Sequence, residues 1–376
     1  MRKIHKGHIA LGLLFVFNLL SFKGPLGLEH YLEKRLSKVV IGYYPSWKKE
    51  EFDCNKIKYK HLTHIAHAFT KPDSEGNLIV DRDYLYPELN KTAHERNVKV
   101  LMSIGGWGNC EGFPGMTSTT EKRNRFITQV LEFCKANSYD GVDIDWEFVS
   151  NPSEQQNFVF FIKELSAALK AQSPPLLLTM ASPSEHYWGK WINYEELIDD
   201  FDYIGFMTYS YHGEWADHSG HNSPLFSCND DSCDSVNDSF LYACLRQIPK
   251  EKLLLGIPFF GRSFDCSDLY QKFEKSNYYG YSEVRNFIDS GWRCIWDNCA
   301  KVPFLQKPDQ SEIVSFDDER SISEKCQYIK GKNVAGVIIW ELSQDYSQSS
   351  SPLLKVIGRE FRYKKIMKEK KLISIN

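Results

Sequence analysis

The 376-residue sequence has no large excess of charge of either sign, because 46 Lys and Arg stand against 49 Asp and Glu. It lacks an extended basic stretch in its body, which argues against nucleic acid as a partner. No apolar run reaches the roughly 20 residues that a bilayer span needs. Its ten cysteines include no C-x-x-C pair with paired histidines downstream, so no metal or cofactor is expected. No linker, low-complexity tract or internal repeat divides the chain.

The N-terminus has the pattern of a secretory signal. Arg2, Lys3 and Lys6 precede a short apolar run from Ile9 to Phe22, and this order is typical of such signals. We therefore expect residues 1–27 to be a signal peptide, and the mature protein to be secreted, extracellular and free of the membrane. An uncleaved membrane anchor remains the alternative. At the other end, residues 364–376 are expected to be a basic, solvated tail.

The cysteines favour disulfide bridges, because the count is even and the chain has a secretory signal. The close pairs Cys228/Cys233 and Cys294/Cys299 lie in polar, loop-like sequence, and they leave the connectivity open. The triplets that begin at Asn90 and Asn237 fit the N-glycosylation pattern.

Eight short apolar runs predict parallel strands that are buried on both faces. Helical periodicity separates several of them, over 120–137, 152–171 and 321–330. This alternation predicts the α/β class, as a (β/α)8 TIM barrel formed by residues 28–261 and 316–363. The aromatic, polar segment 262–315 is expected to be a small α+β insertion between strand 7 and helix 7. The eight runs are Val39–Tyr44, Thr63–Phe69, Val98–Ile104, Gly141–Glu147, Leu176–Ala181, Tyr203–Met207, Leu253–Phe259 and Val334–Trp340.

The segment from Asp140 to Glu147 carries the chemistry. Asp143, Asp145 and Glu147 alternate along one run, so the period of a strand places all three on one face. In a barrel that face is the interior, and Glu147 lies nearest the carboxyl end, where active sites are built. Three neighbouring carboxylates raise one another's pKa, so one of them should keep a proton near neutral pH and act as a general acid.

The motif Asp140-x-x-Asp143-x-Asp145-x-Glu147 resembles the signature of glycoside hydrolase family 18, the chitinase family. Four further stretches at strand ends are similar to motifs of the same family, and together they extend the resemblance from about Val39 to Phe361. These stretches are Ser103-Ile104-Gly105-Gly106, Met207-Thr208-Tyr209, Gly256-Ile257-Pro258-Phe259-Phe260-Gly261-Arg262 and Gly336-Val337-Ile338-Ile339-Trp340-Glu341.

The resemblance implies an enzyme that hydrolyses β-1,4 bonds between N-acetylglucosamine units by a retaining, substrate-assisted mechanism, without a protein nucleophile. The acetamido oxygen of the −1 sugar attacks its own anomeric carbon, and Glu147 acts as acid and then as base. By similarity, Asp145 holds the acetamido N–H, Asp143 shares a proton with Asp145, and Tyr209 donates to the acetamido carbonyl. Trp340 would form the floor under the sugar.

The resemblance also implies a set of residues for substrate binding, and chitin or N-acetylglucosamine oligosaccharides as partners of a monomeric enzyme. Glycines of the Ser103 motif are expected to be mainly structural, because they let the backbone pass beneath the acids. The implied substrate-binding residues, with Trp340, are Tyr43, Trp47, Phe69, Gly106, Trp107, Met207, Ser210 and Arg262.

Two positions depart from the family pattern: Ser210 stands where Asp is usual, and Phe260 where Tyr is common. Because a carboxylate is missing at position 210, the strength of sugar binding and the pH optimum are expected to differ from those of the family. Two other functions stay open at this point. One is an endo-β-N-acetylglucosaminidase that cuts N-glycans, and the other is a catalytically weak, chitin-binding lectin of the same fold.

Overall fold

The computed structural model describes residues 36–228 and 234–362. The expected signal segment, the basic tail and Cys233 lie outside these ranges. Within them, eight parallel strands form a closed barrel, in the order β1-β14-β8-β7-β6-β5-β4-β2, and β1 pairs with β2 to complete the ring. The TIM barrel predicted from the apolar runs is therefore confirmed.

Each of the eight expected runs overlaps a barrel strand, and several strands extend one to three residues beyond the run. A short strand, β3 (Leu78–Ile79), adds to β2 in antiparallel orientation. The barrel strands are β1 (Val39–Pro45), β2 (His64–Pro72), β4 (Lys99–Gly105), β5 (Gly141–Asp145), β6 (Leu177–Ser182), β7 (Tyr203–Phe206), β8 (Leu253–Pro258) and β14 (Gly336–Trp340).

The helices cover the outside of the barrel, and their ends follow local sequence signals. Thr119 caps α4 by accepting from the Lys122 N–H, and Ser138, directly after the helix, adopts the left-handed conformation. Asn151 and Asp318 cap α5 and α10 in the same way. The helices are α2 (Pro87–His94), α3 (Phe113–Thr117), α4 (Thr120–Asn137), α5 (Pro152–Lys170), α6 (His186–Gly189), α7 (Tyr194–Leu197), α8 (Val236–Leu245), α10 (Glu319–Lys332) and α11 (Pro352–Glu360), and short 3-10 turns span 46–48, 54–56 and 59–61.

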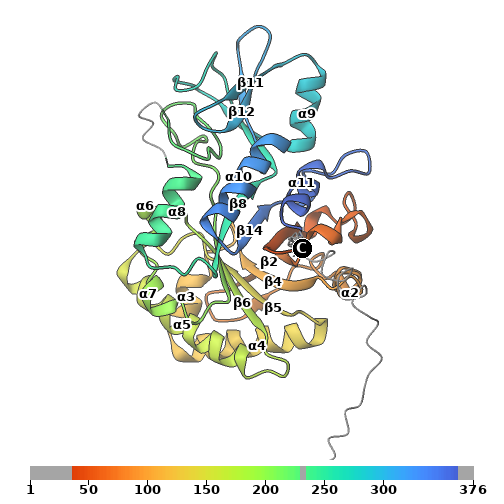
Figure 1. Ribbon diagram of the computed structural model, residues 1–376. Helices are drawn as coiled ribbons and strands as arrows, with labels where there is room; N and C mark the ends of the chain where they lie inside the picture. Colours follow the sequence, from red (N-terminus) through yellow and green to blue (C-terminus); the bar gives the residue numbers. More distant parts are fainter. Residues whose placement is uncertain (1–35, 229–233, 363–376) are drawn as a thin grey trace, which may run out of the picture. The chain divides into compact units, whose positions relative to one another are not determined.

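An insertion follows β8 and consists of an antiparallel sheet with one helix. In Figure 1 this part forms the top of the view, while α4 and α5 lie at the bottom. The sheet has the order β10-β9-β13-β12-β11, and Arg262 lies on β9, the first of these strands along the chain. Its elements are β9 (Phe260–Phe264), β10 (Ser276–Gly280), α9 (Tyr281–Asp289), β11 (Arg293–Asp297), β12 (Val302–Gln306) and β13 (Ile313–Ser315).

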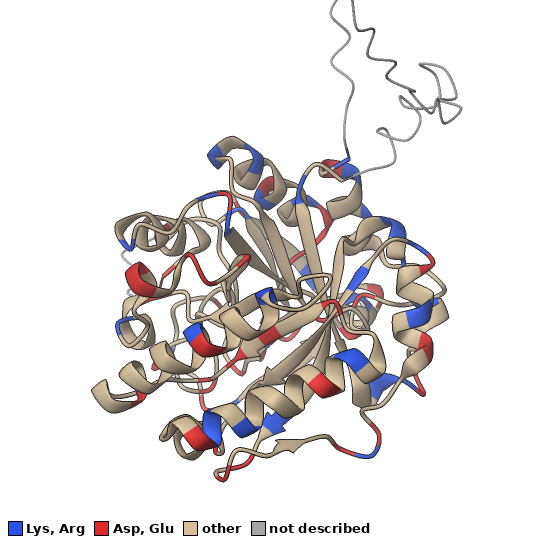
Figure 2. Ribbon diagram, turned by 90° about the horizontal axis from the view of Figure 1, so that it is seen from below, with Lys and Arg blue, Asp and Glu red and all other residues tan. Residues whose placement is uncertain are grey.

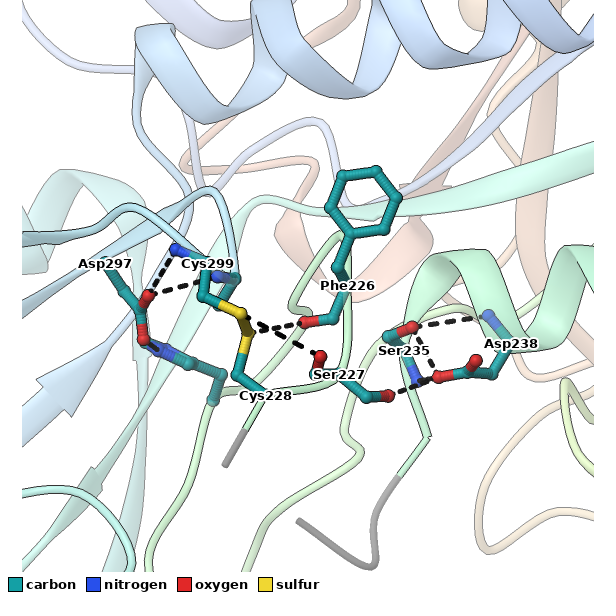
Figure 3. The surroundings of a disulfide bond; sticks show 9 residues. Phe226, Ser227, Cys228, Ser235, Asp238, Asp297 and Cys299 are labelled. Atoms are coloured by element: carbon teal, nitrogen blue, oxygen red, sulfur yellow. Dashed lines mark hydrogen bonds and ion pairs between the residues drawn. A yellow bond between two sulfur atoms is a disulfide. The ribbon is translucent and has the colours of Figure 1, made fainter. Parts of the chain in front are cut away.

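A disulfide joins the segment after β7 to the insertion. Cys228 pairs with Cys299, one member from each of the two close cysteine pairs (Figure 3). The carboxylate of Asp297 accepts the backbone N–H of Cys299 at 2.8 Å, which fixes the turn that carries it. The expectation of several bridges is wrong for the other described cysteines, because seven of them are free thiols.

Side chains separate into two layers around the strands. Val142 and Ile144 pack outward against the helices, while Asp143 and Asp145 point into the barrel among small and aromatic residues. Asp140 lies before the strand and accepts the Val100 N–H at 2.7 Å, which ties the start of β5 to β4. The alternation predicted for this segment therefore places the two aspartates inside the barrel.

The outer surface carries mixed charge. Figure 2 shows Lys and Arg interspersed with Asp and Glu along the helices in that view. No helix in the described ranges is long and apolar enough to traverse a bilayer. Asn90 is 4% exposed and its amide donates to the Asn137 carbonyl at 2.8 Å, so this asparagine is not accessible for glycosylation.

Candidate active site

Asp143 is held inside the barrel by three hydroxyl groups from three other strands. Its Oδ2 accepts from Tyr43 Oη at 2.8 Å and from Ser103 Oγ at 2.7 Å. Its Oδ1 accepts from Thr179 Oγ1 at 2.6 Å. Burial raises the pKa of Asp143, and the three hydroxyls oppose that rise by stabilising the carboxylate. The carboxyl group is therefore fixed in orientation.

Asp145 lies one layer nearer the carboxyl end of β5 and is 4% exposed. Its Oδ1 has no hydrogen-bond partner among the described residues. Burial, together with the charges of Glu147 and then Asp143, raises the pKa of Asp145 well above its usual range. A buried carboxyl oxygen without a partner is costly in an apolar site, so this group is available to a ligand in the barrel mouth.

Glu147 follows the end of β5 and is half-buried. Burial raises the pKa of Glu147 from its ordinary 4.5 to about 7, and a hydrogen bond from the Trp107 backbone N–H acts in the opposite direction. A carboxyl group with a pKa near 7 is protonated in a large fraction of molecules at neutral pH. It can both donate and accept a proton there, as a general acid and base must.

The turn after β4 passes close beneath these carboxyl groups. Gly106 has φ +83°, and a Cβ at this position would lie 2.4 Å from the Phe69 ring. Its N–H donates to the Asp145 carbonyl at 2.7 Å. Only glycine combines this backbone conformation with such close packing, so the structure gives Gly106 a structural part at the site.

Four aromatic residues gather on one side of the barrel mouth, at the ends of β1, β2 and β14. Trp340 lies 5.6 Å from Tyr43 and stacks on Phe69 at 5.7 Å between ring centroids. Trp47 lies 6.1 Å from Phe69 and is 56% exposed. Tyr43 is buried at 2% exposure, so it reaches the site through its contact with Asp143.

Trp107 follows Gly106, and its side chain is 78% exposed. Its ring lies 6.5 Å from Phe148, which stacks on Trp188 at 5.1 Å. Sequence reasoning missed Phe148 and Trp188. The position of Phe148 directly after Glu147 was an available signal, but Trp188 lies on α6 and no motif marks it.

Tyr209 follows β7. Burial raises the pKa of Tyr209 well above its usual range, and the nearby charges of Asp145 and Glu147 add to this rise. Its ring makes an edge contact with Phe260 at 5.7 Å. Met207 packs against the apolar cluster inside the barrel. Ser210 has φ +58°, and its N–H donates to Asn222 Oδ1 at 3.1 Å.

Arg262 projects from β9, and its buried Nε has no partner among the described residues. Its guanidinium lies 5.0 Å from the Trp215 ring and 5.4 Å from the Tyr278 ring. Trp215 is 57% exposed. Sequence reasoning also missed Trp215 and Tyr278, because contacts between the segment after β7 and the insertion are not encoded in any local pattern.

The structure thus brings the sequence-predicted residues to the carboxyl end of one barrel. Asp143, Asp145 and Glu147 lie along β5 and just after it, aromatic rings lie at the ends of β1, β2 and β14 and after β4, and Tyr209 follows β7. In the described ranges, no group of three or more His, Cys, Asp or Glu residues is placed to hold a metal ion. The arrangement can transfer a proton to and from a ligand that contacts Asp145.

Comparison with known proteins gives the same family along most of the chain. The pattern of the family "Glycosyl hydrolases family 18" matches residues 39–345. Chitinase A1 of Niallia circulans is 30% identical over 84% of this chain and 58% of its own length. Oviduct-specific glycoprotein of Mus musculus is 32% identical over 75% of this chain and 43% of its own length. The chain thus spans about half the length of these two relatives.

Solved structures agree with the sequence relatives. The Group IV chitinase of Ostrinia furnacalis has a TM-score of 0.79 and 27% identity, over 86% of this chain and 99% of that chain. The GH18 chitinase from Cycas revoluta, solved in complex with (GlcNAc)3, has a TM-score of 0.79 and 25% identity over the same shares. The protein therefore belongs to glycosyl hydrolase family 18.

Proposed function

We propose that this protein is a secreted, monomeric chitinase that hydrolyses β-1,4 bonds between N-acetylglucosamine units. The observation that carries the proposal is Glu147, whose pKa is raised to about 7 beside Asp145, whose buried Oδ1 has no partner among the described residues. One group is tuned to exchange a proton, and the other is ready to accept the N–H of an acetamido group. The Cycas revoluta enzyme in complex with (GlcNAc)3 supports this substrate class.

The proposed reaction begins with proton transfer from Glu147 to the oxygen of the leaving sugar. The acetamido oxygen of the −1 sugar attacks the anomeric carbon as that bond breaks, and an oxazolinium ion forms. Asp145 accepts the acetamido N–H and stabilises the positive charge, while Tyr209 aligns the acetamido carbonyl. Glu147, now ionised, takes a proton from a water molecule that attacks the anomeric carbon and displaces the acetamido oxygen, which opens the oxazolinium ring and regenerates the acid. The two successive displacements at this carbon retain its configuration.

Asp143 takes no direct part in bond breaking in this scheme. Its three hydroxyl partners hold it below Asp145, and it provides a place for a shared proton when Asp145 changes its charge. Trp340 forms the floor beneath the −1 sugar, and its contacts with Tyr43 and Phe69 hold the indole in place. Trp107, whose backbone N–H bonds to Glu147, is assigned to the leaving-group side.

The experiment is a digestion time course with N-acetylglucosamine oligosaccharides of defined length, with products sized by mass spectrometry. A high-mannose glycoprotein is incubated in parallel. Release of shorter N-acetylglucosamine oligomers supports the proposal. Release of glycan from the glycoprotein alone supports an endo-β-N-acetylglucosaminidase, and binding of oligomers without any cleavage supports a lectin. Either of the last two outcomes would overturn the proposal.

A further inference from the structure

The position of Tyr209 depends on a segment of irregular backbone after β7. On its N-terminal side, Thr208 is completely buried. The Thr208 side chain donates from Oγ1 to the Gly256 carbonyl of β8 at 2.7 Å. The Thr208 carbonyl accepts from Ser223 Oγ at 2.6 Å. That carbonyl belongs to the peptide group that joins Thr208 to Tyr209, so its orientation bears directly on where the phenol points.

The C-terminal side of Tyr209 is held by the neighbour of Ser223. Asn222 is completely buried, and its Oδ1 accepts from the Ser210 N–H at 3.1 Å. Its Nδ2 donates to the Phe260 carbonyl at 3.1 Å, at the start of the insertion. The two consecutive residues Asn222 and Ser223 therefore bind the peptide groups on both sides of Tyr209.

Ser223 is itself oriented by a buried ion pair between Lys325 of α10 and Asp317, which precedes this helix. Lys325 Nζ donates to Ser223 Oγ at 2.7 Å and to Asp317 Oδ2 at 2.6 Å. The Lys325 and Asp317 side chains are 0% and 1% exposed. Since Lys325 occupies a lone pair of the Ser223 oxygen, the hydroxyl proton of Ser223 is directed to the Thr208 carbonyl.

Such a pair is not explained by stability alone. Desolvation of two charges often costs as much as their attraction returns, and apolar residues of similar volume are often as stable. This pair has a second effect, because Lys325 holds Ser223, and Ser223 in turn holds the Thr208 carbonyl in one arrangement. Lys325 and Ser223 are 102 residues apart, so this restriction couples the outer helix layer to the barrel mouth.

We propose that Ser223, oriented by the Lys325–Asp317 pair, is a positioning residue for Tyr209. It holds the Thr208–Tyr209 peptide so that the phenol reaches the acetamido carbonyl of the substrate. The inference rests on the proposed function, because that function defines the task of Tyr209. Ser223 acts only through Tyr209 and touches no substrate.

The test compares Ser223→Ala with Ser321→Ala. Ser321 Oγ donates to the other oxygen of the same carboxylate, Asp317 Oδ1, at 2.6 Å, but it has no contact with the segment around Tyr209. Both variants lose one buried hydroxyl from one network, and Ser321→Ala also loses the acceptor of the Asp318 N–H at the start of α10. Unfolding curves measure the stability loss of each variant, so that an effect on kcat/KM can be compared with it. Ser223→Ala should lower kcat/KM on tri-N-acetylchitotriose by about tenfold, since small misplacements of aligning groups are costly. Ser321→Ala should remain within about twofold of the wild type.

Two further arms make the result specific. Adding Ser223→Ala to Tyr209→Phe should cause no further loss of kcat/KM, because two residues that act as one unit are not additive. In the Glu147→Gln background, Ser223→Ala should weaken binding of the trisaccharide and Ser321→Ala should not. The second arm tests the inference even if the wild type proves inactive, an outcome that would refute the proposed function alone. Equal effects of the two serine variants, or fully multiplicative losses with Tyr209→Phe, would overturn the inference.

Discussion

Glu147→Gln should make the protein more stable at alkaline pH while it slows hydrolysis by at least ~10²-fold. Glutamine keeps the size of the side chain and an oxygen that can accept the Trp107 N–H. It removes the ionisation that burial opposes, since the pKa of Glu147 is raised from 4.5 to about 7. A folded state that holds its proton to higher pH loses stability as pH rises between these two values.

The magnitude follows from the two pKa values. A tenfold change in proton affinity corresponds to ~1.4 kcal/mol, so the free-energy cost of ionising Glu147 in the folded protein reaches at most ~3.5 kcal/mol. Because the side chain is half-buried and water screens part of the effect, we expect ~1–3 kcal/mol. Removing this charge also relieves Asp145, whose pKa Glu147 helps to raise.

The assay is urea unfolding of the wild type and the Glu147→Gln variant at pH 4 and pH 8. The variant should be more stable at pH 8, and the difference should nearly vanish at pH 4, where both side chains are neutral. Glu132→Gln is the matched control, because Glu132 lies exposed on α4 and should show little change at either pH. A Glu147→Gln variant that is equally or less stable than the wild type at pH 8 would refute the reasoning.

Three further predictions concern the floor of the site, its departure from the family pattern and its disulfide. Trp340→Ala should lower kcat/KM roughly 30-fold, since the indole face contributes on the order of 2 kcal/mol of apolar contact to the sugar. Steady-state kinetics with an oligosaccharide measures this loss, and a change below threefold would show that Trp340 does not bind the sugar. Ser210→Asp should raise kcat/KM and move the alkaline limb of the pH–rate profile to higher pH, because an added negative charge disfavours ionisation of Glu147. Asp tolerates the left-handed backbone at this position, and an unchanged profile would contradict this prediction. Cys228→Ser should lower the free energy of unfolding by about 4 kcal/mol in urea, as expected for a bridge that spans 71 residues, whereas equal stability of the oxidised wild type and the variant would show that the bridge is unimportant.

The barrel could be predicted because its signals are local. Apolar runs mark each strand, and periodicity placed a helix over 120–137, where α4 is found. The alternation of Asp143 and Asp145 with Val142 and Ile144 indicated which side chains enter the barrel. Strand geometry alone led to that result, since successive residues point to opposite faces.

The partners of the acids could not be predicted, because they come from distant parts of the chain. Ser103 and Thr179 lie 40 and 36 residues from Asp143, and only the register of β4, β5 and β6 brings them level with it. The pairing of Cys228 with Cys299 and the contact between Ser223 and Lys325 depend in the same way on how the segment after β7 meets the insertion and α10.

The most direct measurement of the central claim is product release from a fluorogenic tri-N-acetylglucosamine glycoside by the wild type and by Glu147→Gln. The account predicts measurable turnover by the wild type and a loss of at least ~10²-fold in kcat for the variant, as expected when a general acid is removed, with binding of the oligosaccharide retained. A variant that keeps the full rate would contradict the assignment of Glu147 as the proton donor.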